Sequence, residues 1–133
     1  AAHYEKGDTN MATEKIWKLA LKALPHLVKC AEEGKTMTYG DLGEKIGASA
    51  YYVVPKVLGC IRDEICRPND LPLISTIVVS KGDGLPGISF FPGKRITDKQ
   101  ERRRISEDLQ RRVFAYTKWG EVLAELGLKR TPS

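Results

Sequence analysis

The chain has little cysteine, only two histidines and no long hydrophobic run, and each shortage excludes a class of protein. Its longest apolar runs, such as residues 73–79, fall far short of the ~20 residues that cross a bilayer, so we expect no membrane span. The three cysteines, Cys30, Cys60 and Cys66, lack CxxC spacing, which argues against both a disulfide scaffold and a zinc site. Because no signal-peptide pattern is present either, we expect a protein of the reducing cytoplasm.

The sequence also lacks a complete catalytic arrangement. Neither a Ser/His/Asp set nor a pair of carboxylates can be assembled from residue spacing. The glycine-containing segment 81–84 is too short to cradle a phosphate and precedes no helix, so it is read as a hairpin turn. We therefore predict a protein that is not an enzyme and that uses no cofactor and no metal.

What the sequence does contain is an ordinary globular composition with an excess of positive charge. The 133 residues are 41% hydrophobic and 29% charged, which fits one folded domain. The net charge is +5, and residues 94–112 hold eight basic against four acidic side chains, which is +4 of that excess. Such a balance favours a polyanionic partner.

The apolar pattern predicts an N-terminal helix, a short strand and a pair of helices. Residues 1–10 lack periodicity and are expected to be a flexible arm or residues added for expression, so the domain is placed at 11–128 with a polar tail at 129–133. A first helix should run from Thr13 to near Gly34, with a bend or break at Pro25. A strand at 36–38, a helix at 39–46, a turn at 47–49 capped by Ser49 and a helix at 51–65 should follow. The inward stripe of that last helix is Val54, Val57, Leu58, Ile61 and Ile65.

Two short helices joined by a glycine-containing turn are typical of a helix-turn-helix. The β-branched run 73–80, the turn 81–84 and the apolar run 88–91 indicate a β-hairpin beside it, which would be a wing. A basic helix capped by Asp98 and a last helix at 119–126, ending at Gly127, complete the chain. The predicted fold is therefore α+β and mainly helical, a winged helix-turn-helix. The core-facing stripe of the basic helix is Ile105, Leu109, Val113 and Tyr116.

Residues 37–87, about two-fifths of the chain, resemble the C-terminal winged-helix domain of alkylguanine-DNA alkyltransferases and alkyltransferase-like proteins. The resemblance is carried by Thr38-Tyr39-Gly40-Asp41-Leu42, by Val57-Leu58-Gly59-Cys60-Ile61-Arg62 and by the run Leu71 to Val79. It implies a DNA-binding scaffold, and it matches Tyr39 to the family's tyrosine near the DNA phosphate.

The same resemblance places Ser75 where the family has its alkyl-accepting cysteine, with Thr76 and Ile77 in place of the neighbouring histidine and arginine. A serine without an adjacent base does not replace an activated thiolate, so alkyl transfer is not expected. The family's base-flipping arginine falls near Pro55, next to Lys56.

The residues expected to contact DNA lie on the third helix, the wing and the basic segment. Asp63 on the third helix would repel phosphate. On the basic helix, spacings of four residues would also pair arginines with carboxylates, which describes a solvated helix equally well. The candidates are Tyr39, Tyr52, Lys56, Arg62, Lys81, Lys94, Arg95, Arg102 and Arg103.

We therefore expect a non-catalytic protein that binds duplex DNA, associated with the nucleoid if so. Two alternatives stay open. The scaffold would serve as a protein-interaction module, such as an adaptor or an inhibitor from a mobile element, or it would recognise alkyl damage without transferring the alkyl group.

Overall fold

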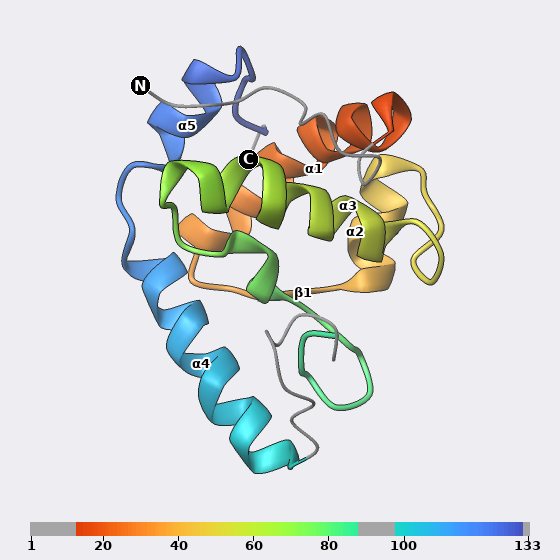
Figure 1. Ribbon diagram of the computed structural model, residues 1–133, viewed down its shortest axis with the longest axis vertical. Coiled ribbons are helices and arrows are strands. Elements are labelled where there is room, and N and C mark those ends of the chain that lie inside the picture. Colours follow the sequence, from red (N-terminus) through yellow and green to blue (C-terminus); the bar gives the residue numbers. More distant parts are fainter. Residues whose placement is uncertain (1–12, 88–97, 132–133) are drawn as a thin grey trace.

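The computed structural model describes residues 13–87 and 98–131 and is mainly helical with one small sheet (Figure 1). The expected α+β class is therefore confirmed. The arm at 1–10, the second hairpin strand at 88–91, Lys94 and Arg95 lie outside the described residues. Within the described residues, no helix has both the length and the apolar character needed to cross a membrane.

Helix α1 (Glu14–Glu32) lies at the centre and contacts each of the other described α-helices. The Thr13 hydroxyl caps it by accepting a hydrogen bond from the Ile16 N–H at 3.2 Å, and Gly34 ends it with a φ of +68°. The predicted break at Pro25 is wrong, because the helix continues through this residue. Both halves bury the same apolar stripe, and that packing outweighs the one backbone hydrogen bond that proline removes. The buried residues are Ile16, Ala20, Ala23, Leu24, Leu27, Val28 and Ala31.

Strand β1 (Met37–Thr38) leads directly into α2 (Tyr39–Ile46), as the sequence predicts. Thr38 and Asp41 form a capping box at the start of α2, in which each side chain accepts a hydrogen bond from the other residue's backbone N–H. Gly47 ends the helix in the left-handed conformation, with a φ of 68°.

The predicted third helix is present but is built from three kinds of turn. It consists of α3 (Val54–Cys60), a π-helix η1 (Ile61–Cys66) and a short 3-10 turn η2 (Arg67–Asn69). The start falls later than predicted because residues 50–53 form a turn, in which the Ser49 hydroxyl accepts from the Tyr52 N–H at 3.1 Å. The wider π turn lets two consecutive residues, Ile65 and Cys66, face the core. All five residues of the predicted inward stripe are buried.

The predicted strand at 73–80 is largely wrong. Residues Ile74–Ile77 form a 3-10 turn, η3, and only β2 (Val78–Val79) is extended. The Leu73 carbonyl accepts hydrogen bonds from the Thr76 N–H at 3.0 Å and from the Thr76 hydroxyl at 2.7 Å, which closes the turn. All four side chains of η3 are buried, and a strand, whose side chains alternate between two faces, would bury them all only between two layers.

The sheet consists of β1 and β2, paired in parallel with Met37 opposite Val78 and Thr38 opposite Val79. After β2 the chain turns back at 80–85, where the Ser80 N–H donates to the Leu85 carbonyl at 2.8 Å. Of the first arm of the predicted hairpin, only Val78 and Val79 are extended and paired with β1, and the turn at 81–84 lies where the sequence predicts it.

Helix α4 (Lys99–Ala115) begins at Asp98, as predicted, and its N-terminal end projects beyond the rest of the fold (Figure 1). Of the four residues in its predicted core-facing stripe, only Val113 is fully buried, and the other three are partly exposed. Helix α5 (Trp119–Glu125) follows and ends before Gly127, as predicted. The polar tail is tied to α1, since Arg130 pairs with Glu32.

Candidate functional site

The turn between α2 and α3 depends on a glycine at position 43. Gly43 is buried on α2, and a Cβ atom there would lie 2.6 Å from the Ala48 carbonyl oxygen. Only a residue without a side chain lets the backbone of the turn approach the helix this closely. The turn in this helix pair is therefore fixed by local sequence.

The outer side of α3 is uncovered in the described structure, while its inner side is buried. Tyr51 and Tyr52, just before the helix, are 81% and 72% exposed, and their rings pack edge to face with centroids 5.0 Å apart. Lys56 is exposed one turn further along. Two of the predicted DNA-binding residues, Tyr52 and Lys56, thus lie on one open face.

Arg62 lies on the same side but is already paired. Its guanidinium donates two hydrogen bonds to the Asp63 carboxylate, at 2.9 and 3.0 Å, and Arg67 approaches the same carboxylate at 3.9 Å. The hydrogen bonds from Arg62 lower the pKa of Asp63, and those to Asp63 raise the pKa of Arg62. The negative charge that was expected to repel phosphate is therefore balanced within the protein, and Arg62 contributes little net charge of its own.

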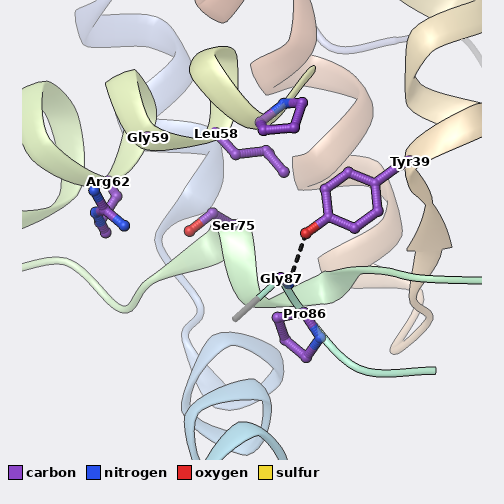
Figure 2. Close-up of a pocket in the computed structure, with 8 residues that line it drawn as sticks. Tyr39, Leu58, Gly59, Arg62, Ser75, Pro86 and Gly87 are labelled. Carbon is purple, nitrogen blue, oxygen red and sulfur yellow. Dashed lines mark hydrogen bonds between the residues drawn. The ribbon is translucent and has the colours of Figure 1, made fainter. Parts of the chain in front are cut away.

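A small cavity, which we call the Ser75 pocket, lies between α3, η3 and the chain after the 80–85 turn (Figure 2). Its volume is about 100 Å³, and Ser75 lies in its wall with 3% of the residue exposed. The Ser75 Oγ has no hydrogen-bond partner among the described residues and points toward the side where Arg62 lies. The lining residues are Tyr39, Pro55, Leu58, Gly59, Arg62, Ser75, Pro86 and Gly87.

Tyr39 closes the opposite side of this pocket. Its hydroxyl oxygen accepts a hydrogen bond from the Gly87 N–H at 2.7 Å, which leaves the hydroxyl proton free to donate. Burial raises the pKa of Tyr39, so the hydroxyl stays protonated at neutral pH. The pocket therefore offers hydrogen-bond donors on two sides, and no histidine, cysteine or carboxylate is among the described residues that line it.

A larger, mostly apolar groove, which we call the Tyr51 groove, adjoins the Ser75 pocket. Its volume is about 490 Å³, and it shares Tyr39, Pro55 and Gly87 with the smaller cavity. Lys81 is among its lining residues, so the 80–85 turn and the start of α3 face one hollow. The lining residues are Thr38, Tyr39, Gly40, Ala50, Tyr51, Pro55, Ser80, Lys81 and Gly87.

The basic helix α4 reaches this region through Arg103, whose Nη2 donates to the Asp83 carbonyl at 3.0 Å. Arg102 is half buried, and its Nε has no hydrogen-bond partner in the described part of the chain. Of these two predicted contacts, Arg103 is thus held by the protein and Arg102 is partly covered by it. The predicted pairing at four-residue spacing holds only for Asp108 with Arg112, at 3.3 Å, among residues 98–112.

Cys60 and Cys66 are not activated thiols. Burial, reinforced by Glu64 and Asp63, raises the pKa of Cys60 to about 11, and burial raises that of Cys66 to about 12. Both thiols are therefore protonated at neutral pH. Among residues 13–87 and 98–131, no group of three His, Cys, Asp or Glu side chains is placed to hold a metal ion.

Sequence reasoning missed two parts of this site. From the sequence, Ser75 stands out as the replacement for a cysteine, but its unpartnered hydroxyl depends on η3, which the sequence does not predict. Tyr51 is not among the residues predicted from the sequence, although two adjacent aromatic residues ahead of an amphipathic helix are a signal of an exposed contact surface. Comparison of the chain with protein families, with curated proteins and with solved structures gives no match.

Proposed function

We propose that this protein is a non-catalytic DNA-binding domain built on the winged-helix plan. In this proposal α2, the turn at Gly47 and α3 form the helix-turn-helix, and the 80–85 turn belongs to the wing. The observation that carries it is the open outer face of α3, where Tyr52 and Lys56 are exposed while Val54, Val57 and Leu58 are buried. A helix placed in this way can enter a major groove without unfolding any part of the domain.

The charges on this face support an anionic partner. Lys56 and Lys81 are exposed, and neither forms an ion pair with another described residue. Asp63 is neutralised by Arg62, so the carboxylate closest to Lys56 along the helix does not cancel it. Lysines that are not held by the protein are the ones that can neutralise phosphates and release counterions.

Fluorescence anisotropy with a labelled duplex at about 50 and 200 mM salt tests the proposal. We expect binding at the lower salt and a steep loss at the higher salt, with affinity dropping by orders of magnitude if six or more phosphates are neutralised. Lys56→Ala and Lys81→Ala should each weaken binding to every sequence and lower the salt slope by about 1. Lys118→Ala, at the start of α5, is the matched control and should bind like the wild type. Failure to bind any duplex at 50 mM salt would leave the protein-interaction module as the better proposal.

A second candidate, recognition of an alkylated base without alkyl transfer, is favoured by the Ser75 pocket. That function requires a cavity beside Ser75, and one of about 100 Å³ with an unpartnered hydroxyl lies there, a size that fits an alkyl group and not a whole base. Duplexes that differ only by one alkylated guanine distinguish the two candidates. Equal affinity supports plain DNA binding, and tighter binding of the modified duplex with unchanged DNA as product supports damage recognition.

A further inference from the structure

We propose that the Tyr51 groove holds one unpaired nucleotide, with its base stacked on Tyr51 and its phosphate at Lys81. The DNA that this domain prefers would then carry an unpaired position. This inference rests on the proposed DNA-binding function and concerns a hollow distinct from the Ser75 pocket.

The size of the groove points to a ligand of this kind. Sites that enclose small organic ligands have volumes of roughly 300–1,000 Å³. The Tyr51 groove, at about 490 Å³, falls in this range, whereas the Ser75 pocket, at about 100 Å³, falls below it. A nucleotide is the unit of DNA that has a matching size.

The aromatic residues point to a base that is out of its pair. Tyr51 is 81% exposed, and Tyr52 supports its ring through an edge-to-face contact. A paired base offers only its edge to a protein, whereas an unpaired base offers a flat face that stacks on a tyrosine ring. Single-strand-binding surfaces combine such aromatic residues with nearby cations.

The charge at the groove favours an anionic group, such as a phosphate, over a cationic partner. Among the described residues that line it, Lys81 is the one that carries a charge. Two carboxylates close to the groove in sequence accept hydrogen bonds from backbone N–H groups. Asp83 accepts one from Leu85 at 3.0 Å, and Asp41 accepts one from Thr38 at 3.4 Å. The groove is therefore mostly apolar and carries one cation, Lys81, among its described lining residues, which suits a nucleotide.

Three duplexes of one length test this inference by fluorescence anisotropy: one fully paired, one with a single-nucleotide bulge, and one whose bulge carries no base. We expect the wild type to bind the base-bearing bulge about 5- to 100-fold more tightly than the other two. The duplex with the abasic bulge controls for DNA bending. It is as flexible as the duplex with the base-bearing bulge, but it offers no base to stack on Tyr51.

Tyr51→Ala should abolish this preference, measured as the ratio of the affinities for the base-bearing bulge and the paired duplex, and Tyr51→Phe should keep it. Lys118→Ala, at the start of α5 and outside the groove, is the control and should retain the preference. Equal affinity for all three duplexes would overturn the inference, and so would a preference that survives Tyr51→Ala. Both outcomes leave the proposed duplex binding intact, whereas absence of binding to any duplex removes both proposals.

Discussion

The hydroxyl of Tyr39, at the first position of α2, accepts a hydrogen bond from the Gly87 N–H at 2.7 Å, joining residues 48 positions apart in the chain. This bond holds the segment that follows the 80–85 turn against the start of α2. Both hollows of the proposed DNA face are bounded by these two residues, so the bond sets the distance between their walls.

Tyr39→Phe should therefore lower the free energy of unfolding by about 1 kcal/mol, because it removes one partly buried hydrogen bond and leaves the ring in place. Urea denaturation measures this change. Tyr52→Phe is the matched control, since Tyr52 is 72% exposed, and it should unfold like the wild type. Equal midpoints for all three proteins would show that the bond contributes nothing.

Gly43→Ala should destabilise the protein by about 1–3 kcal/mol, because the new methyl group would overlap the Ala48 carbonyl and force the turn after α2 outward. Gly40→Ala, on the same helix, has the Thr38 Oγ1 at 3.8 Å as its nearest neighbour and should be neutral or slightly stabilising. Thermal unfolding of the two variants measures the contrast. Similar melting temperatures would mean that the turn adapts freely.

Ser75→Ala should leave stability unchanged or raise it by up to about 1 kcal/mol, since it removes a buried hydroxyl that has no partner in the described structure. Thr76→Val, one residue on, should instead cost about 1 kcal/mol because it breaks the 2.7 Å bond to the Leu73 carbonyl. Chemical denaturation of both variants tests this. A clear loss of stability in Ser75→Ala would show that its hydroxyl is satisfied within the protein.

Stability should fall as the pH rises above about 8.5, the ordinary thiol pKa, because burial raises the pKa of Cys66 to about 12. In that interval the unfolded chain loses the thiol proton while the folded chain keeps it, so deprotonation favours unfolding. Between pH 7.5 and 9.5, the wild type should lose about 1 kcal/mol more than Cys66→Ala.

Urea unfolding at both pH values provides the comparison for the thiol. Cys30→Ala serves as the control, because Cys30 is only partly covered, and it should follow the wild type closely. Parallel losses in the wild type and Cys66→Ala would contradict the assignment.

Local patterns in the sequence predicted the helices well. Thr13, Gly34, Asp98 and Gly127 marked helix ends correctly because capping depends on a few adjacent residues. The run at 73–80 was misread because β-branched residues favour strands in general, whereas here the Thr76 hydroxyl closes a helical turn against the core.

The candidate site was harder to predict than the helices. Lys56 and Tyr52 could be placed on an open face from the helical repeat alone. The pairing of Arg62 with Asp63 and the contact of Arg103 with Asp83 could not, because side-chain direction and contacts between distant segments are set by the packed structure. The meeting of Tyr39, Tyr51 and Lys81 around one groove likewise depends on tertiary contacts.

The π-helical turn η1 gives the chain a spare residue directly after α3. A deletion of one residue within η1 would restore the regular α-helical repeat and keep the apolar side chains inward. The same deletion within α3 would rotate everything after it by about 100° and bring polar side chains into the core. Homologues of this protein are therefore expected to carry single-residue insertions or deletions within 61–66 and none within 54–60.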